Sequence, residues 1–301
     1  MSWQNSALTW ALRRWVKPDT SRGQDIAASR ALTDRVPFRA KLVKGWRLRV
    51  ENGAVFKGDW IEPEREDHAA RRRCILYFHG GAYITMAARS YRTLTSRLAI
   101  WSDARLFALD YRLAPEYRFP AALDDAVAAY RALIEAGTPA SRIVVAGDSA
   151  GGGLALALLV ALRDAGDALP AGAVLFSPWT DLAATGQSLI DNDACDALIF
   201  GAWVHGVAVH YLGDTAATNP LASPLYADLT GLPAMLVQVS GTEVLLDDSR
   251  RVVEKARLAG VDATLRVWPG LPHVWQFFAT ILPEGRAALR EAAAFVREAL
   301  P

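Results

Sequence analysis

The chain has 301 residues, of which 52% are hydrophobic and 22% are charged, and its net charge is +1. These proportions are typical of a globular protein with one large core. The 33 Lys and Arg residues are matched by 32 Asp and Glu residues. This balance gives no electrostatic reason to expect a nucleic-acid partner, which would require clustered positive charge.

The cysteines and the N-terminus favour an intracellular protein. Two cysteines cannot form a disulfide scaffold, and neither Cys74 nor Cys195 has zinc-ligand spacing, so we expect both to be buried in the core. The N-terminal stretch has no uninterrupted apolar segment of the kind that a secretory signal needs. The longest apolar run, residues 151–162, is shorter than the ~20 residues of a membrane span. We therefore expect a soluble, cytoplasmic protein without stable membrane insertion. Three basic residues near the N-terminus support contact with a membrane surface only weakly.

The first part of the chain predicts helices and then a hairpin. Leu8, Leu12 and Trp15 have the i, i+4, i+7 spacing of a helix. Two strand-like runs, 41–50 and 54–63, flank the turn signal Glu51-Asn52-Gly53, which predicts an antiparallel hairpin. The charged run that follows, 62–73, has no apolar periodicity and predicts a solvated loop.

The rest of the chain alternates between buried strands and helices. Continuous apolar runs, typical of parallel strands covered on both faces, occur at 74–78, 105–111, 142–147, 171–177, 234–240 and 263–268. Helical patterns lie between them, including 122–137 and 248–260, which both end at a glycine, and 284–300 closes the chain. With the hairpin, this order predicts an α/β protein with about eight strands, mostly parallel, and helices on both faces of the sheet.

Two stretches fall outside this alternation, residues 1–39 and residues 182–228. The second contains a further helical pattern, at 196–212. Open α/β sheets bind ligands at the carboxyl ends of their strands, so both stretches are expected to form a helical cap there. The core of the protein would then consist of residues 40–181 and 229–301. Apolar residues of the cap would either line a pocket for a hydrophobic ligand or attach the cap to the core: Trp3, Trp10, Trp15, Phe200, Trp203 and Val207.

Ser149 is the candidate nucleophile. Gly147-Asp148-Ser149-Ala150-Gly151 fits the pattern G-x-S-x-G between a predicted strand and a predicted helix. In this pattern a sharp turn lifts the serine hydroxyl above the sheet, and glycines are needed because side chains would clash. The helix that follows adds free N–H groups beside a developing oxyanion. The alternative is a tight turn in which Ser149 only caps the helix.

A second motif, His79-Gly80-Gly81-Ala82, directly follows the strand 74–78. Two glycines leave backbone N–H groups open to a ligand. The geometry that accompanies G-x-S-x-G places an oxyanion hole here, shared with the N–H of Ala150. We therefore expect Gly80, Gly81 and Ala150 to be the donors and His79 to be structural.

A serine nucleophile needs a general base, because its hydroxyl is a poor nucleophile until the proton is removed. Of the five histidines, His273 lies in a Pro/Gly-rich loop directly after the last strand, which is the place expected from the order nucleophile, acid, histidine. His68 lies in the charged run, and His205 and His210 lie in the predicted cap helix, where we expect them on its polar edge.

These motifs resemble those of the hormone-sensitive-lipase-like (bacterial family IV) esterases of the α/β-hydrolase fold. The resemblance implies a carboxylic-ester hydrolase with a Ser–acid–His triad, no metal or organic cofactor, and a cap built as described above. In relatives the stretch around Arg112, Pro115 and Glu116 buttresses the oxyanion loop. The matching segments lie in order along the chain, at 79–83, 110–126, 147–152, 177–182, 223–233 and 268–278.

The triad acid is the site residue with several candidates. Glu243, Asp247 and Asp248 follow the strand 234–240 closely. Many relatives have Asp-Pro-Leu where this chain has Glu243-Val244-Leu245. Glu243 lies in the loop itself, whereas Asp247 and Asp248 begin a helix, where acids cap N–H groups and oppose the helix dipole. We therefore expect Glu243 to be the triad acid, with Asp247 as the alternative.

Together these residues predict a serine carboxylesterase that acts through an acyl-enzyme intermediate. The expected substrates are small hydrophobic esters, either short-to-medium acyl esters or lactones of apolar alcohols. An amidase or deacetylase would use the same triad, and a non-catalytic ligand receptor of this fold is a more distant alternative, because receptors usually lack a triad residue. The sequence leaves a homodimer open.

Overall fold

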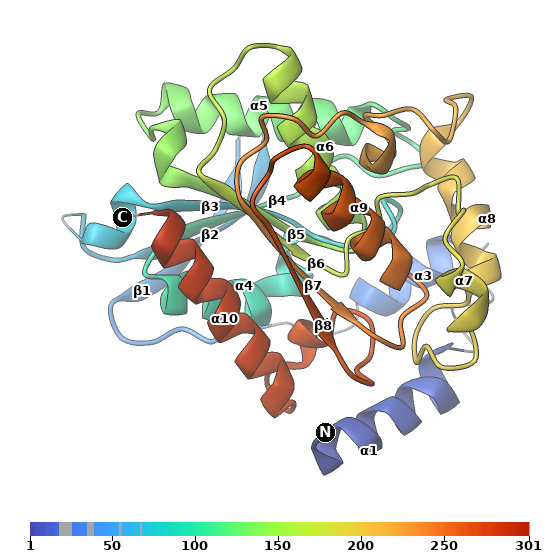
Figure 1. Ribbon diagram of the computed structural model, residues 1–301. Coiled ribbons are helices and arrows are strands. Elements are labelled where there is room, and N and C mark those ends of the chain that lie inside the picture. The colour runs from blue at the N-terminus through green and yellow to red at the C-terminus, as the bar shows by residue number, and fades with distance from the viewer. Residues whose placement is uncertain (18–25, 35–38, 54–55, 67, 301) are drawn as a thin grey trace.

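The computed structural model describes residues 1–17, 26–34, 39–53, 56–66 and 68–300. Its centre is an eight-stranded sheet with the strand order β1-β2-β4-β3-β5-β6-β7-β8 (Figure 1). The strands are β1 Trp46–Asn52, β2 Lys57–Pro63, β3 Cys74–Phe78, β4 Arg105–Leu109, β5 Ile143–Asp148, β6 Gly172–Phe176, β7 Met235–Ser240 and β8 Ala263–Trp268. Parts of the predicted cap, hairpin and charged run lie outside the described residues, at 18–25, 35–38, 54–55 and 67.

The six predicted core strands are confirmed as β3 to β8. All neighbouring pairs among them are parallel, while β1 pairs with β2 and β2 with β4 in antiparallel fashion. The continuous apolar runs mark these strands because β3, β5, β6 and β7 are buried along their whole length. The predicted hairpin is confirmed, but Asn52 pairs with Lys57, so the turn follows Asn52 rather than including Glu51 and Asn52.

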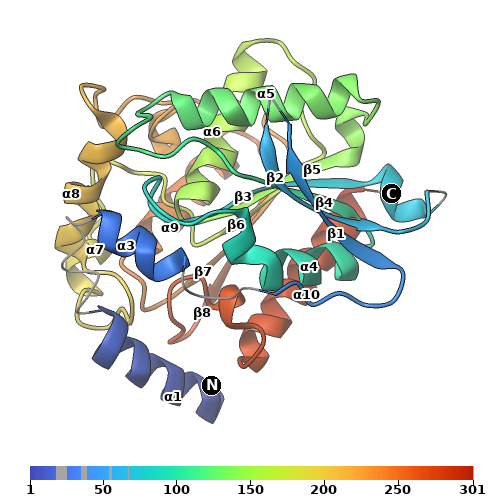
Figure 2. The same cartoon turned by 180° about the vertical axis from the view of Figure 1, so that it is seen from behind.

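Helices cover both faces of the sheet (Figures 1 and 2). On one face lie α5 (Ala121–Glu135), α6 (Ala150–Asp164) and α9 (Leu246–Leu258). On the other lie α4 (Arg92–Ser102) and α10 (Pro283–Ala299). This is the three-layer arrangement that alternating strands and helices produce. Short helical turns occur at η2 Ala69–Arg72, η3 Ala88–Tyr91, η4 Ala140–Arg142, η5 Pro224–Tyr226 and η6 Trp275–Phe278.

The two stretches outside the alternation form separate helices. The N-terminal stretch contains α1 (Trp3–Ala11), which continues into the wider turn η1 (Leu12–Val16), and α3 (Ile26–Asp34). The inserted stretch contains α7 (Ser188–Asp191) and α8 (Gly201–Leu212). Both views show α3 on the same side of the molecule as α7 and α8 (Figure 2). No helix in the described part of the chain is both long enough and apolar enough to cross a membrane.

Two predictions about individual side chains are corrected. Cys74 is buried, and burial raises its pKa to about 11, but Cys195 is exposed and is not a core thiol. Glu62 belongs to β2 instead of a solvated loop, and it is buried against Arg47 and Arg49.

The aromatic residues of the two stretches behave differently. Trp3, Trp10 and Trp15 are 76%, 60% and 60% exposed, so they neither join α1 to the core nor form an enclosed apolar wall. On α8, by contrast, Val207 is buried and Trp203 packs against the main core. The attachment role is therefore confirmed for α8 but not for the tryptophans of α1 and η1.

Candidate active site

Ser149 stands at the turn between β5 and α6, at the carboxyl end of its strand. Its backbone has φ 52° and ψ −123°, a conformation that is strained for a residue with a side chain. The neighbouring glycines make this turn feasible. A Cβ at Gly147 would lie 2.3 Å from the carbonyl oxygen of Gly151, and a Cβ at Gly151 would lie 2.1 Å from that of Phe78. The strand–turn–helix context that G-x-S-x-G requires is therefore present.

The simpler interpretation of Ser149 as a helix cap is wrong. Ser149 occupies the N-cap position of α6, but its side chain makes no capping hydrogen bond. A capping serine stabilises a helix by accepting a hydrogen bond from an N–H group of the first turn, and that bond is missing. The position of this serine is thus explained by the turn and not by helix capping.

Glu243 and His273 form a buried hydrogen-bonded pair. Nδ1 of His273 lies 2.6 Å from Oε2 of Glu243. The other carboxylate oxygen, Oε1, accepts hydrogen bonds from the hydroxyl of Ser177 and from the N–H of Ser240, each at 2.8 Å. Ser177 directly follows β6, Ser240 is the last residue of β7 and His273 lies in the loop after β8, so partners from the carboxyl ends of three strands hold the carboxylate. This arrangement seats the longer side chain of a glutamate.

The two loops that carry this pair are also joined to each other. The N–H of Leu271 donates to Oγ of Ser240 at 2.9 Å, and Oγ1 of Thr242 donates to the carbonyl of Leu271 at 3.3 Å. These contacts hold the loop after β8 against the loop after β7. The hydrogen bond between His273 and Glu243 is therefore supported by further hydrogen bonds between the two loops that carry these residues.

The second ring nitrogen of His273 is positioned to accept a proton. Nε2 is buried, and among the described residues it has no hydrogen-bond partner. It is therefore not hydrogen-bonded to the hydroxyl of Ser149. The bond from Nδ1 to the carboxylate favours the tautomer in which Nε2 carries the lone pair. Catalytic hydrogen bonds are often long before substrate binds, so an open Nε2 is compatible with a general base.

The charges around His273 favour its protonated form. Burial lowers the pKa of His273, but the charge and hydrogen bond of Glu243, with further contributions from Asp196 and Asp148, raise it above its ordinary value overall. Burial raises the pKa of Glu243, and the adjacent imidazole partly opposes this effect. An imidazolium formed at this position would therefore be stabilised.

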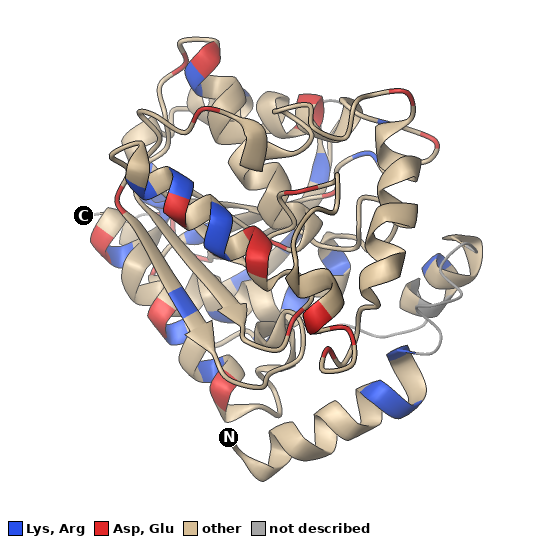
Figure 3. Cartoon of the chain, turned by 45° about the vertical axis from the view of Figure 1, so that its right-hand side comes forward, with Lys and Arg blue, Asp and Glu red and all other residues tan. Residues whose placement is uncertain are grey.

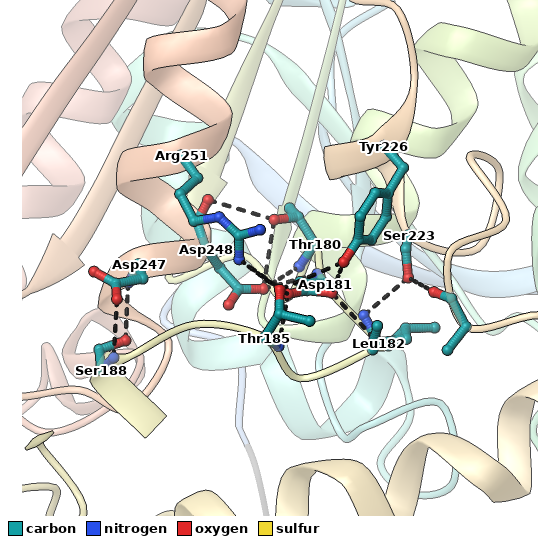
Figure 4. A network of polar contacts seen from close by, with 12 residues as sticks. Thr180, Asp181, Leu182, Thr185, Ser188, Ser223, Tyr226, Asp247, Asp248 and Arg251 are labelled. Carbon is teal, nitrogen blue, oxygen red and sulfur yellow. Dashed lines mark hydrogen bonds and ion pairs between the residues drawn. The ribbon is translucent and has the colours of Figure 1, made fainter. Parts of the chain in front are cut away.

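The other two acids of the cluster point elsewhere, as Figure 4 shows. Oδ2 of Asp248 accepts hydrogen bonds from the N–H groups of Thr180 and Asp181, at 2.7 and 2.8 Å. Asp247 accepts one from the N–H of Ser188 at 2.9 Å. The expectation that both acids cap α9 is thus wrong, because α9 has no side-chain cap. The two acids bond N–H groups of the stretch 180–188 instead.

The position of these acids at the start of α9 is as expected. Asp247 and Asp248 lie in the first turn of α9, and basic residues lie in its last turn (Figure 3). Negative charge at the start of a helix and positive charge at its end both oppose the helix dipole favourably. Neither acid contacts His273, so the structure brings only Glu243 to the histidine.

One of the predicted oxyanion donors is already occupied. The N–H of Gly80 donates to Oδ1 of Asp148 at 3.0 Å and lies 3.2 Å from the hydroxyl of Tyr91. Asp148 is itself buried and accepts from the hydroxyls of Tyr77 and Tyr91, and burial raises its pKa to about 6. The prediction that Gly80 is an oxyanion donor is therefore wrong. A glycine is needed here because the loop passes very close to Asp148: a Cβ at Gly80 would lie 2.3 Å from the Asp148 carboxylate.

The next N–H groups along the loop are open. Gly81 and Ala82 both have positive φ, 109° and 55°, and two such residues in succession present neighbouring N–H groups to one side. Among the described residues, no acceptor is bonded to the N–H of Gly81, Ala82 or Ala150. These three groups are the candidate donors for an oxyanion. Sequence reasoning missed Ala82, although it is the next residue after the glycine pair.

His79 has the structural role that was expected. Its ring stacks on Tyr111 with centroids 4.3 Å apart and planes at 13°. Nδ1 lies 2.7 Å from the carbonyl of Gly80, and the hydroxyl of Tyr111 donates to the carbonyl of His79 at 2.7 Å. Burial lowers the pKa of His79. These contacts fix the start of the oxyanion loop.

The stretch around Glu116 supports the same loop, as its resemblance to relatives implies. The N–H of Ala114 donates to the carbonyl of Tyr83 at 2.9 Å. Arg30 of α3 donates to the carbonyl of Ile84 at 2.7 Å and forms two bonds of 2.8 Å with Glu116. The N-terminal stretch thus contacts the oxyanion loop directly.

The remaining histidines and the surface cleft are separate from this centre. On α8, His205 is exposed and His210 is partly exposed, as expected for a polar edge. A cleft of about 460 Å³ lies between α1 and Gly270. None of Ser149, Glu243 and His273 lines it.

Comparisons with known proteins agree with this geometry. Residues 75–277 match the α/β hydrolase fold family. The chain is 48% identical over 241 residues to an acetyl-hydrolase of Streptomyces hygroscopicus, a match covering 80% of this chain and 79% of that protein. A crystal structure of an esterase from the bacterial hormone-sensitive lipase family is 40% identical, with a TM-score of 0.89, covering 100% of this chain and 99% of the other.

A further similar structure is that of EstE5 from a crystal soaked in p-nitrophenyl butyrate, which is 36% identical, with a TM-score of 0.91 and coverage of 100% and 99%. The match to the family spans most of the chain, and the relatives are aligned over most of their own lengths. The chain therefore belongs to the α/β hydrolases, among the hormone-sensitive-lipase-like esterases.

Proposed function

We propose that the chain is a serine carboxylesterase in which Ser149 is the nucleophile, His273 the general base and Glu243 the acid that orients it. The observation that carries this proposal is the environment of the two ring nitrogens of His273. Nδ1 is held at 2.6 Å by Glu243, while Nε2 is buried and open. A base oriented in this way, together with a serine on a strained strand-to-helix turn, supports the activation of a hydroxyl.

The reaction proceeds in two acyl transfers. Nε2 of His273 takes the proton of the Ser149 hydroxyl as Oγ attacks the ester carbonyl, and it then gives that proton to the leaving alcohol. Water repeats the sequence on the acyl-enzyme and releases the acid. Glu243 stays ionised and stabilises the imidazolium in both steps.

The N–H groups of Gly81, Ala82 and Ala150 stabilise the oxyanion of each tetrahedral intermediate. Ala150 is the first residue of α6, so the positive end of the helix dipole adds to its N–H. Removing one such donor typically costs ~10²–10³ in kcat. The bond from Gly80 to Asp148 supports this role indirectly, because it fixes the peptide that precedes Gly81.

Short acyl esters are the substrates that we propose. Relatives of this chain include an acetyl-hydrolase and a protein that was soaked in p-nitrophenyl butyrate, and both names point to small acyl groups. Lactones and esters of apolar alcohols share the same reacting carbonyl.

We extend the proposal to a cap made of residues 1–39 and 182–228 over a core of residues 40–181 and 229–301. The contact of Arg30 with Ile84 and the stacking of Tyr211 on Tyr83 support it.

Labelling and hydrolysis measured together test the function. A fluorophosphonate probe should label the wild-type protein and fail to label Ser149→Ala, and p-nitrophenyl acetate and butyrate should be hydrolysed faster than longer esters. Wild-type turnover by Ser149→Ala would refute the proposal. Matched ester and amide substrates separate an esterase from an amidase, since the preferred leaving group has the higher kcat/KM.

A further inference from the structure

The peptide group that joins Glu243 to Val244 is held at both ends by the inserted stretch. The carbonyl of Glu243 accepts a hydrogen bond from Nδ2 of Asn192 at 2.8 Å, and the N–H of Val244 donates to Oδ2 of Asp196 at 2.9 Å. Both groups belong to the same planar unit, so these bonds fix its rotation. The direction in which the Glu243 side chain leaves the backbone is thereby set by residues of another segment.

Asp196 is an unusual residue for this purpose because it is an acidic residue that is buried, with an exposed fraction of 1%. Oδ1 accepts hydrogen bonds from the N–H groups of Leu198 and Ile199, at 2.8 and 3.0 Å, and Oδ2 accepts the one from Val244. Among the described residues, Asp196 has no ion-pair partner. Burying a carboxylate is costly unless its oxygens are hydrogen-bonded, and here three backbone N–H groups supply those bonds.

The charge of Asp196 acts on the proposed catalytic pair. It is one of three carboxylates that raise the pKa of His273, together with Glu243 and Asp148, which stand after β7 and at the end of β5. It also raises the pKa of Glu243. Asp196 therefore affects the imidazole through space as well as through the peptide that follows Glu243.

The N-terminal stretch fixes the turn that carries Asp196. Lys17, directly after η1, is buried, and its ammonium donates to the carbonyl of Asp196 at 3.0 Å and lies 4.4 Å from the centre of the Phe200 ring. One helical turn earlier, Arg13 donates to the carbonyl of Cys195. Two cations of one helix thus hold two successive carbonyls of the turn.

We propose that Asp196 is a positioning residue for the triad: its side chain holds the Glu243–Val244 peptide, its charge stabilises the imidazolium of His273, and Lys17 locks it in place. This inference rests on the proposed ester hydrolysis by Ser149, Glu243 and His273. It assigns to the N-terminal stretch and the inserted stretch a direct effect on proton transfer, in addition to covering the site.

The test is the pH profile of p-nitrophenyl acetate hydrolysis by Asp196→Asn in the full chain. Asparagine has nearly the same shape and keeps an oxygen for Leu198 and Ile199, but it lacks the charge and turns an N–H group toward Val244. We expect kcat to fall by ~10–100-fold, the range that misplacement of a catalytic group produces. We also expect the acidic limb of kcat/KM to move to lower pH, because a neutral neighbour no longer favours the imidazolium.

Two matched variants separate geometry from charge. Asn192→Ala removes the other bond to the same peptide without changing any charge, so kcat should fall while the acidic limb stays in place. Asp193→Asn is the same substitution as Asp196→Asn, three residues earlier. The Asp193 side chain bonds the N–H of Gly201 at the start of α8 and is partly exposed, so this variant should keep both the rate and the profile of the wild type.

Lys17→Met tests whether Lys17 holds the turn that carries Asp196. Its control is Arg14→Met, on the exposed side of the same helix. We expect Lys17→Met to lower kcat by ~10-fold with little change in KM, because the turn loosens while the substrate site is kept. Arg14→Met should match the wild type. This pair also decides the matter if Asp196→Asn does not fold, since wild-type kcat in Lys17→Met then overturns the proposal.

Other outcomes are also decisive. Wild-type kcat and pH profile in a folded Asp196→Asn variant would overturn the proposal, as would a lower kcat with an unmoved acidic limb, which would leave Asp196 a purely structural role. Failure of the proposed function itself is recognised separately, because the wild-type protein would then neither hydrolyse p-nitrophenyl acetate nor react with a fluorophosphonate.

Discussion

Nδ1 of His273 lies 2.6 Å from Oε2 of Glu243, and both side chains are buried. The opposite oxygen of Glu243 is saturated by the Ser177 hydroxyl and the Ser240 N–H, so the carboxylate cannot rotate without breaking these bonds. Glu243→Gln should therefore keep its oxygen toward Ser177 and Ser240 and turn its NH₂ group toward the ring. The imidazole would then take the wrong tautomer, and we expect kcat to fall by as much as ~10⁴. Steady-state kinetics on p-nitrophenyl acetate measure the loss.

Asp247→Asn is the matched control for that substitution. Asp247 bonds the N–H of Ser188 and lies 3.6 Å from Arg250 at the surface of α9, and it does not contact His273. We expect wild-type kcat with a small decrease in Tm, because exposed ion pairs contribute only ~0–1 kcal/mol. If Asp247→Asn were inactive and Glu243→Gln active, the acid would have to be reassigned to Asp247.

The pH dependence of kcat/KM should reflect the carboxylates around His273. The neutral imidazole is the active base, and its pKa is raised above the ordinary 6.5. Activity is therefore present at high pH and lost as the pH falls through this raised value, so the midpoint of the acidic limb should lie above 6.5. A pH series on the free enzyme at low substrate concentration measures it. A midpoint below the ordinary value would mean that burial outweighs the negative charges.

Asp248→Asn should change how stability depends on pH. Burial raises the pKa of Asp248 from 3.8 to about 7, so the folded state holds a proton that the unfolded state has lost. The stability from this proton is fully present below 3.8 and is lost as the pH rises through about 7. Asparagine keeps an oxygen for the N–H groups of Thr180 and Asp181 and does not titrate. Tm of the variant relative to wild type should therefore be higher at about pH 8 than at about pH 5. Parallel Tm curves would contradict this.

Gly80→Ala should inactivate the protein even though its N–H is not an oxyanion donor. The added Cβ would lie 2.3 Å from the Asp148 carboxylate and 2.9 Å from the Tyr91 hydroxyl. The loop must then move away from Asp148, which carries Gly81 and Ala82 out of position. We expect a ~10²-fold or larger loss in kcat. The control is Gly206→Ala on α8, which has nothing within 4 Å and should gain ~0.5–1 kcal/mol of stability with unchanged kinetics. Normal activity of Gly80→Ala would show that the loop tolerates displacement.

The sheet and two members of the proposed triad could be predicted because each has a strong local signal. Strands buried on both faces are continuous apolar runs, as in residues 74–78, and the runs alternate with helical patterns. Ser149 is marked by flanking glycines that a close backbone approach requires. His273 follows from its place after the last strand. These features depend on neighbours in the sequence and can therefore be read from it.

The features that could not be predicted depend on contacts between distant segments. The N–H of Gly80 is occupied because Asp148, 68 residues later, reaches it, and no local pattern indicates that bond. Asp247 and Asp248 look like helix caps in the sequence but bond the stretch 180–188, which is placed by the fold. Cys195 was expected in the core on the basis of residue type alone, yet it lies in an exposed turn.

Ser177 and Asp196 show the same limit at the site itself. Ser177 begins the matching segment 177–182, but sequence reasoning assigned its hydroxyl no role, and that hydroxyl reaches Glu243 only because β6 lies between β5 and β7. Asp196 lies in a stretch that was expected to form a cap, and nothing in its sequence context indicates that it contacts Val244. Both residues become visible only when the loops at one edge of the sheet are placed together.

The contacts of α1 have a consequence for the order in which the protein matures during synthesis. The N–H of Ser2 donates to Glu284 at 2.6 Å across 282 positions, and Asn5 donates to the carbonyl of Gly270 at 2.8 Å. Residues at the start of α1 are thus held by residues 265 and 282 positions further along the chain. During synthesis, α1 cannot make these contacts until Gly270 and Glu284 have emerged from the ribosome. Because contacts between residues so far apart in the sequence form slowly, α1 should be among the last elements to dock.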